Sequence, residues 1–310
     1  MIYTLANTQM KNYLTASSSP LTESVERLRY CYEAGFSSAI LKSAAVYVRT
    51  GTGHGRKVVY VKDGYYADAS FEREILTLEE GIELYKKAVE NCPLDMLLIP
   101  SVSASSLEPE KWIEPCRKFE LYGASLIQLD FFYLGTVEHN ENFYQKLKIL
   151  LTELVQNLEC TVMPKLNLNF EPDRTCKILK ESGVKTVSLL DSMRETPDPN
   201  LGLHEGTTSY FGKRQLPHTL RYLKVAKQYG LEVCAGGGVT SKEDVDLLLA
   251  SGADMVQVAS YILNRDFRAV DELLDVEFCL KTHSEITKHN PWCDCETGAK
   301  CENCGACVPH

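Results

Sequence analysis

Two lysines end otherwise apolar segments of this 310-residue chain. Lys42 closes the run SSAILK, and Lys165 closes TVMPK. A lysine that is buried without a partner is costly, so each side chain must reach water or meet an anionic or electron-accepting ligand. One such lysine would be weak evidence, but two of them, on segments far apart in the sequence, favour a role in ligand binding. The alternative is a solvated rim.

A glycine triplet, Gly236–Gly238, stands between the strand-like run EVCA and the helical run Ser241–Ala250. Glycines allow a turn that is too tight for side chains, and they leave backbone amides free to approach an anion. Ala259 and Ser260 form a second small-residue edge after the next strand-like run. Two adjacent edges of this kind predict a phosphate site. The alternative is that the triplet is only a turn.

Five of the 12 cysteines stand in the last 18 residues, in the pattern C-x-C-x5-C-x2-C-x2-C. Short returns between thiolates let one chain wrap a tetrahedral ion or a cluster. We therefore predict a 4Fe–4S cluster or zinc in this tail, with a disulfide cluster as the remaining alternative. The predicted ligands are Cys293, Cys295, Cys301, Cys304 and Cys307. The other seven cysteines are spread singly and are expected to be buried thiols.

Strand-like and helical runs alternate along the chain and must position these residues. We expect strands at Asn12–Ser17, Ser37–Lys42, Asp95–Ser101, Ser125–Asp130, Thr161–Leu166, Thr186–Leu190, Glu232–Ala235 and Met255–Ala259. Helices are expected at Leu21–Ala34, Leu78–Asn91, Glu108–Tyr122, Asn142–Asn157, Pro172–Ser182, Leu216–Tyr229, Ser241–Ala250 and Phe267–Leu280. Two long connections interrupt the pattern, a small hairpin within Ala45–Ala69 and a loop over Met193–Gln215.

The alternation predicts an α/β protein, a (β/α)8 TIM barrel over residues 1–285 followed by a short cysteine-rich tail over 286–310. The ligand site of such a barrel faces the carboxyl ends of its strands. An open doubly wound sheet is the alternative, but it typically carries a glycine-rich fingerprint after its first strand, and NYLTASSSP is not one.

The formal net charge of −9 argues against nucleic acid as the main partner, because phosphate backbones are bound by basic faces. No 18-residue apolar run occurs, and the run MIYTLANTQMKNYL has neither a basic region nor a long apolar core. We therefore expect a cytoplasmic protein that does not bind a membrane.

Five stretches of the sequence occur together in one order and spacing: TASSSP, AGFSSAILKS, MPKLNLN, YFGKRQLPHTLRYL and AGGGVTSKEDVDLLLASGADMVQVAS. In this they resemble the dihydroorotate dehydrogenase family of FMN-binding barrels, which includes the related dihydropyrimidine dehydrogenases. The resemblance covers nearly all of residues 12–280. It implies that Lys42 and Lys165 contact the flavin ring. It also implies that the amides of Gly212, Gly237, Gly238, Ala259 and Ser260 hold the phosphate of FMN. The other predicted cofactor-binding residues, at strand ends, are Ala16, Ser17, Ser43, Gln128, Asp191 and Ser192.

The sequence departs from the family in the substrate half of the site. Where the family has an NLSCPN-like run, this chain has QLDFFYLG, which places Phe131 at the position of the catalytic cysteine. Asp191 and Ser192 replace an expected Asn-Thr pair. We therefore expect a substrate other than dihydroorotate. The candidate proton donors or acceptors are Asp130, Tyr133 and His139, by position alone.

Aromatic and basic residues of the two long connections could build a different pocket, but most are expected at the surface. They are Arg49, His54, Arg56, Tyr65, Tyr66, Arg194, His204, Tyr210 and Arg214.

The resemblance implies an FMN-dependent oxidoreductase that moves a hydride between flavin N5 and a carbon of a small molecule, acting on a CH–CH group. One alternative is a phosphate-binding barrel lyase or isomerase without flavin. Another is a non-catalytic flavoprotein that relays electrons. An electron-transfer partner protein and a homodimer are expected alongside the small-molecule substrate.

Overall fold

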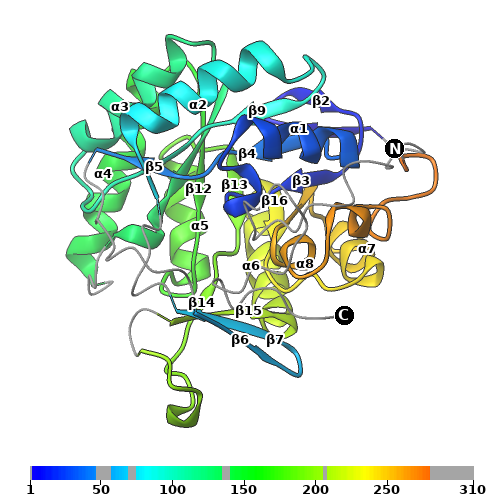
Figure 1. Cartoon of the computed structure of the whole chain (residues 1–310). Coiled ribbons are helices and arrows are strands. Elements are labelled where there is room, and N and C mark those ends of the chain that lie inside the picture. Colours follow the sequence, from blue (N-terminus) through cyan, green and yellow to red (C-terminus); the bar gives the residue numbers. More distant parts are fainter. Residues whose placement is uncertain (1, 47–56, 69–74, 135–139, 205–207, 280–310) are drawn as a thin grey trace.

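A parallel β-sheet of 11 short strands, in the order β8-β5-β10-β11-β12-β13-β16-β17-β3-β4-β9, forms the centre of the computed structural model (Figure 1). The structure describes residues 2–46, 57–68, 75–134, 140–204 and 208–279. The strands are β3 (Leu14–Ala16), β4 (Ser38–Ile40), β5 (Ala44–Ala45), β8 (Leu76–Thr77), β9 (Leu97–Ile99), β10 (Ser101–Ser103), β11 (Leu126–Asp130), β12 (Thr161–Lys165), β13 (Thr186–Leu189), β16 (Glu232–Gly236) and β17 (Met255–Val258).

The two ends of this sheet are joined through one segment of chain. Pro100, which has no N–H to donate to a ladder, divides the segment into β9 and β10. β9 pairs with β4, and β10 pairs with β5 and β11. The sheet therefore curls back on itself. The result is an α/β fold compatible with a TIM-like barrel, as the alternation in the sequence predicted.

Seven predicted helices are present around the curled sheet, each within a few residues of its expected bounds (Figure 1). They are α1 (Val25–Ala34), α2 (Leu78–Asn91), α3 (Glu110–Glu120), α4 (Glu141–Asn157), α5 (Pro172–Glu181), α6 (Leu216–Gln228) and α7 (Lys242–Ala250). Local signals define several ends. Thr77 and Glu80 form a capping box at the start of α2, and Gly35 ends α1 with φ 112°.

The side chains inside the sheet form layers along its strands. At the amino ends lies an apolar cluster of Leu5, Met10, Ile40, Ile99, Leu126, Met163, Cys234 and Met255. Two of these residues belong to an N-terminal hairpin, β1 (Tyr3–Leu5) and β2 (Thr8–Met10). Because side chains alternate along a strand, the next inward residues are two positions further on. They include buried polar groups that bond to one another, such as Gln257 with Ser188 and Gln128 with Ser101.

A second sheet, antiparallel and of four strands, combines both long connections (Figure 1). Its order is β14 (Met193–Arg194), β15 (Thr208–Gly212), β7 (Gly64–Asp68) and β6 (Lys57–Val61). The predicted hairpin within Ala45–Ala69 is confirmed as β6 and β7. The prediction of a plain loop over Met193–Gln215 was wrong, because β15 pairs with β7 from Thr208 to Gly212.

The expected helix over Phe267–Leu280 is also wrong. A single 3-10 turn covers Phe267–Val270, and no α-helix follows it among the described residues up to 279. Phe267, Val270 and Leu273 are buried at a spacing that imitates a helix, while the Asp266 side chain accepts a hydrogen bond from the amide of Arg268. A short helix that was not predicted, α8 (Ser260–Leu263), follows β17 instead.

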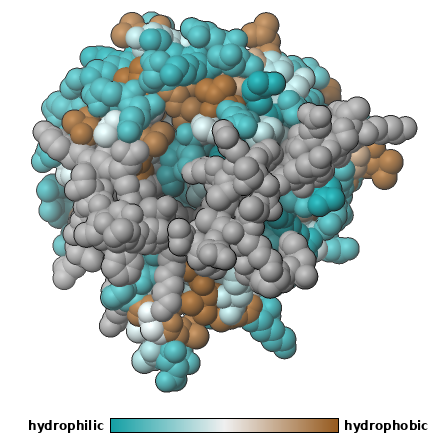
Figure 2. Space-filling view, in the orientation of Figure 1, coloured by the Kyte–Doolittle hydropathy of each residue, from teal (hydrophilic) through white to brown (hydrophobic). Residues whose placement is uncertain are grey.

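The outer surface has the polarity expected of amphipathic helices, since hydrophilic residues dominate the upper part of the face in Figure 2 and apolar areas there are small. Of the seven predicted buried thiols, five are buried and Cys160 and Cys279 are half-buried. None of the helices in the described part of the chain is long and apolar enough to cross a membrane. His139 and the five cysteines of the tail lie outside the described residues.

Candidate functional site

A cavity opens at the carboxyl ends of the parallel strands, between the curled sheet and the four-stranded sheet. The space amounts to about 1080 Å³, part of it open to solvent. Among the predicted site residues, those that line the cavity are Ser17, Lys42, Ser43, Asp130, Lys165, Asp191, Ser192, Gly237, Gly238, Ala259 and Ser260. The structure therefore brings together strand ends that are spread over most of the sequence.

Three predicted cofactor residues do not line the cavity. Ala16 is fully buried in β3 beside Val258, and Gln128 is fully buried one layer beneath the cavity. Gly212 lies in β15 opposite Gly64, with φ 154°. A β-carbon at Gly212 would come within 2.3 Å of the carbonyl oxygen of Asp63. The close contact between β15 and the β6–β7 turn therefore explains that glycine without a ligand.

Four backbone amides at one end of the cavity have no hydrogen-bond partner among the described residues. They belong to Gly237 and Gly238 after β16, and to Ala259 and Ser260 after β17. The two edges are neighbours because β16 and β17 pair in parallel. Amides left over at adjacent strand ends are the donors that phosphate groups use.

The glycine turn is also required by packing. Gly237 and Gly238 have φ of 91° and 88°, a backbone region that favours glycine. A β-carbon on Gly238 would lie 2.3 Å from the amide nitrogen of Leu216 at the start of α6. The turn therefore exposes its amides while its other side rests directly on a helix.

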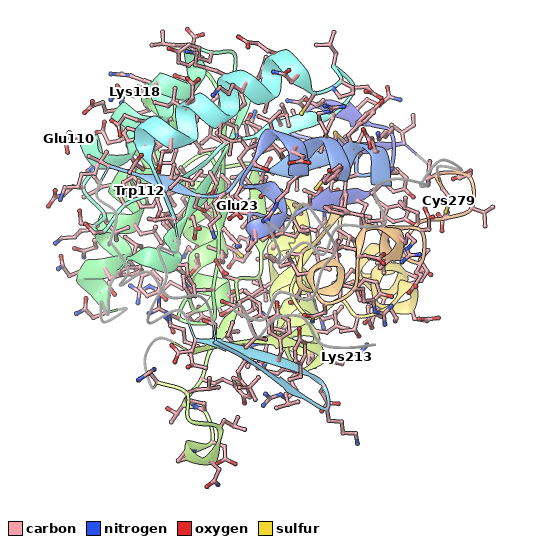
Figure 3. All side chains as sticks on the ribbon, viewed as in Figure 1. Glu23, Glu110, Trp112, Lys118, Lys213 and Cys279 are labelled. Carbon is pink, nitrogen blue, oxygen red and sulfur yellow. The ribbon has the colours of Figure 1, made fainter. Side chains whose placement is uncertain are left out.

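Asp244 of α7 holds the end of this turn in place. Its carboxylate accepts hydrogen bonds of 2.9 Å from both the amide and the hydroxyl of Thr240, and it pairs with Lys213. Burial raises the pKa of Asp244, but the Lys213 and Thr240 hydrogen bonds outweigh burial and lower it. Lys213 directly follows β15, an inner strand of the four-stranded sheet (Figure 3). This ion pair therefore links that sheet to the glycine turn.

The other end of the cavity contains a buried ion pair. The ammonium of Lys165, at the end of β12, lies 3.0 Å from the Asp191 carboxylate, and their side chains are only 8% and 14% exposed. Burial acts to lower the pKa of Lys165, but Asp191 and Asp130 together raise it above its ordinary value. Both carboxylates therefore favour the charged form of Lys165. The chain itself supplies an anionic partner for this lysine, and the predicted contact of Lys165 with a ligand stays a prediction.

Asp130, at the end of β11, faces the same cavity and is 4% exposed. Its carboxylate accepts hydrogen bonds from the Ser43 hydroxyl at 2.6 Å and from the Phe132 amide at 3.1 Å. Burial raises the pKa of Asp130 and Asp191 raises it further, whereas Lys165 and the Ser43 hydrogen bond lower it. The net direction is upward, which moves this carboxyl towards the range useful for proton transfer.

The segment directly after Asp130 contains Phe131 and Tyr133, the latter a candidate proton donor or acceptor. Tyr133 belongs to a short 3-10 helix, Phe131–Tyr133, directly after Asp130. Phe131 is 2% exposed and packs between Trp112 and Phe170, with ring centroids 5.1 and 5.7 Å away. Trp112 belongs to α3 on the outside of the sheet (Figure 3). The position that matches the family's catalytic cysteine is therefore occupied by a core side chain.

The wall of the cavity opposite the strand ends is aromatic. The sequence had suggested Tyr65 as a residue that could build a pocket, but not Phe211. Tyr65 of β7 and Phe211 of β15 stack with their centroids 5.1 Å apart and their planes 11° apart, and both line the cavity. Tyr65, Tyr66 and Tyr210 are all buried, so these three depart from the expectation that most of the aromatic and basic residues of the two connections lie at the surface. The alternation in GYYAD and TSYFG was a signal for two paired strands.

The basic residues Arg194, His204 and Arg214, in or beside the second sheet, are exposed as expected, while Arg49, His54 and Arg56 lie outside the described residues. The Arg214 guanidinium lies 3.8 Å from the centre of the Tyr210 ring and donates to the hydroxyl of Tyr66 at 3.0 Å. His204 contacts Asp68 through a 2.7 Å hydrogen bond at Nδ1. They stabilise the sheet that covers the cavity.

No protein-family model matches this sequence, and no curated protein matches it. Within the described residues, no group of three or more His, Cys, Asp or Glu side chains is arranged to hold a metal ion. The properties of the cavity therefore rest on its own geometry.

Proposed function

We propose that this chain is an FMN-dependent oxidoreductase on a (β/α)8 barrel, similar to the dihydroorotate dehydrogenase family but with a different small-molecule substrate. One observation carries the proposal: four unpartnered amides, two lysines and an aromatic wall share a single cavity at the strand ends.

The amide end of the cavity fits the phosphate of FMN. Gly237, Gly238, Ala259 and Ser260 would hold it through main-chain N–H groups, with no basic side chain needed. Gly212, which the resemblance adds to this set, does not line the cavity. The phosphate site proposed here therefore uses four of the five predicted amides.

The other end fits a flat aromatic ring. Tyr65 and Phe211 offer apolar surface on one side, and Lys42 and Lys165 lie among the strand ends. FMN, when bound, supplies a two-electron donor and acceptor. Lys165 would place positive charge beside the ring, and Asp191 orients that ammonium. Asp130 would exchange a proton with the substrate.

The position of Phe131 supports a substrate other than dihydroorotate. In the family this position supplies a catalytic cysteine, but here the side chain lies in the core between Trp112 and Phe170. Asp191 replaces a neutral amide and is committed to Lys165. A site built this way recognises its substrate through other groups.

A second candidate is a phosphate-binding lyase or isomerase without flavin. It is favoured by one observation: the charge of Lys165 is already matched by Asp191 and lies close enough to Asp130 to affect its pKa. A lysine with two buried carboxylates can carry out acid–base chemistry without a redox cofactor.

Flavin titration separates the two candidates. Purified protein is titrated with FMN, riboflavin and inorganic phosphate, and binding is followed by flavin fluorescence and calorimetry. We expect FMN to bind roughly 100-fold more tightly than riboflavin, because two charge-assisted hydrogen bonds of ~1.5 kcal/mol each would already account for that ratio. A protein that binds phosphate but neither flavin would favour the lyase or isomerase.

We also propose that the cysteine tail over 286–310 holds a 4Fe–4S cluster or zinc. Five thiolates in such close spacing suit either, and iron–sulfur would give the flavin a route to an electron-transfer partner.

A further inference from the structure

Three hydrogen-bonded polar side chains lead from the layer beneath the cavity to Ser43 and Asp130 in the cavity lining. Gln128 Nε2 donates to Ser101 Oγ at 2.9 Å. Ser101 Oγ lies 2.9 Å from Ser43 Oγ, which in turn donates to Asp130 Oδ2 at 2.6 Å. All four residues are at most 4% exposed. They come from strands β11 and β10 and from the β4–β5 connection, so the barrel itself builds the chain.

The direction of the hydrogen bonds follows from the chemistry of the groups. A carboxylate only accepts, so Ser43 must give its one hydrogen to Asp130. Ser101 must then donate to Ser43, and Ser101 accepts from the amide of Gln128. Ser18, which lines the cavity, lies 3.1 Å from Ser43 and can donate to its remaining lone pair. Every hydrogen in the chain therefore points towards Asp130.

Gln128 sets this direction. Its Oε1 is buried and has no partner among the described residues. If the amide were flipped, Nε2 would take the position of Oε1 and its N–H groups would have no acceptor. A buried donor without a partner is rarer than a buried carbonyl oxygen without one. The amide that donates to Ser101 is therefore the favoured orientation, and it favours the ionised form of Asp130.

We propose that Gln128, Ser101 and Ser43 are positioning residues that hold Asp130 as the proton acceptor of the cavity. In this proton transfer, an X–H bond of the substrate breaks, the proton goes to an Oδ atom of Asp130, and the electron pair stays on X. The charged groups that face Asp130 are Lys165 on β12, Asp191 after β13 and Lys42 after β4, all of which line the same cavity. The hydrogen-bonded chain of Gln128, Ser101 and Ser43, called the relay below, opposes the effects of Asp191 and of burial, which both favour the protonated acid.

The catalytic meaning of this relay rests on the proposed function, but its test does not need flavin. The Asp130 carboxyl is followed through a pH titration by 13C NMR of aspartate-labelled full-length protein, and its signal is assigned with Asp130→Asn. We expect Gln128→Met, Ser101→Ala and Ser43→Ala each to move the Asp130 midpoint upward, by about one pH unit for Ser43→Ala, which removes the direct hydrogen bond. Gln128→Met does not touch Asp130, so a purely local role for Gln128 would leave the midpoint unchanged.

Two controls isolate the relay. Ser103 lies two residues after Ser101 in β10 and is as buried as Ser101. Its hydroxyl donates to the backbone carbonyl of Asp130 at 2.9 Å. Ser103→Ala removes the same atom from the same strand, so we expect similar destabilisation with no shift of the midpoint. The double variant Gln128→Met/Ser101→Ala should shift no further than Ser101→Ala alone, because the two act in series.

The outcomes are distinct from those of the flavin titration. An unchanged Asp130 midpoint in folded Gln128→Met and Ser101→Ala would overturn the relay even in a protein that binds FMN. A shifted midpoint in a protein that binds no flavin would support the relay while the proposed function fails.

Discussion

Lys165 is the residue whose removal tests the site most directly. Its ammonium lies 3.0 Å from the Asp191 carboxylate, and it also lowers the pKa of Asp130. Lys165→Met keeps most of the volume and apolar stem of the side chain but removes its charge. The carboxylates of Asp130 and Asp191 then lose the ammonium that lies closest to Asp191.

The expected cost is large. Breaking a buried ion pair from one side typically destabilises a protein by about 3–5 kcal/mol, because an uncompensated charge remains. We expect a loss near the lower end of this range, about 3 kcal/mol at pH 7, since Asp191 is 14% exposed and keeps some contact with solvent. The whole free energy of unfolding of a typical protein is only about 5–15 kcal/mol, so a loss of this size is easily measured.

The loss should depend on pH in a defined direction. The folded-state pKa of Asp130 is already raised by burial and by Asp191, so its folded form binds a proton more readily than the unfolded chain does. Stability therefore falls as pH rises from the ordinary carboxyl range through the folded-state pKa of Asp130. Removing Lys165 raises that pKa further and steepens the fall. The variant should come closest to wild type in mild acid.

Urea unfolding at several pH values, followed by circular dichroism, measures this. Lys148→Met is the matched control, since its 2.6 Å pair with Glu181 is 50% and 41% exposed and should contribute less than about 1 kcal/mol. Lys165→Met/Asp191→Asn removes both charges and should recover part of the stability. If Lys165→Met costs no more than Lys148→Met at pH 7, the inference of a buried ionised pair is wrong.

Three other predictions concern the substrate, the cavity wall and the tail. Phe131→Cys should not create dihydroorotate dehydrogenase activity, because the side chain lies between Trp112 and Phe170, and should cost roughly 3 kcal/mol in urea unfolding. Activity with dihydroorotate would show that this loop is placed differently. Tyr65→Ala should weaken flavin binding about 10-fold in the fluorescence titration, since it removes half of the stacked pair, whereas exposed Tyr60→Ala should not. Anaerobically purified protein should contain about one zinc or several irons per chain, and complete alkylation of metal-free tail thiols would contradict this.

Local sequence patterns predicted most of the strands and helices of this fold. The eight predicted strands and seven of the eight helices are present, because apolar runs of strand length and amphipathic runs of helix length record which faces are buried. The helix over Phe267–Leu280 failed for the same reason, since buried residues at helical spacing can also line a series of turns. In that segment the pattern reported burial and not backbone conformation.

The sequence by itself also determined where the ligand cavity would lie. Parallel strands must end at one edge of their sheet, so polar residues at those ends meet whatever the order of the strands. Eleven of the predicted site residues line one cavity for this reason.

What those residues do to one another was decided only by the tertiary structure. Strand register places Asp130 beside Lys165 and Ser101 beside Gln128, and the two long connections become one sheet through pairing between Tyr66 and Tyr210. A lysine at a strand end has the same local sequence whether it is free or paired with a carboxylate from the next strand. Charge, burial and proton affinity are properties of neighbours that lie far apart in the chain, and only folding brings them within a few ångströms.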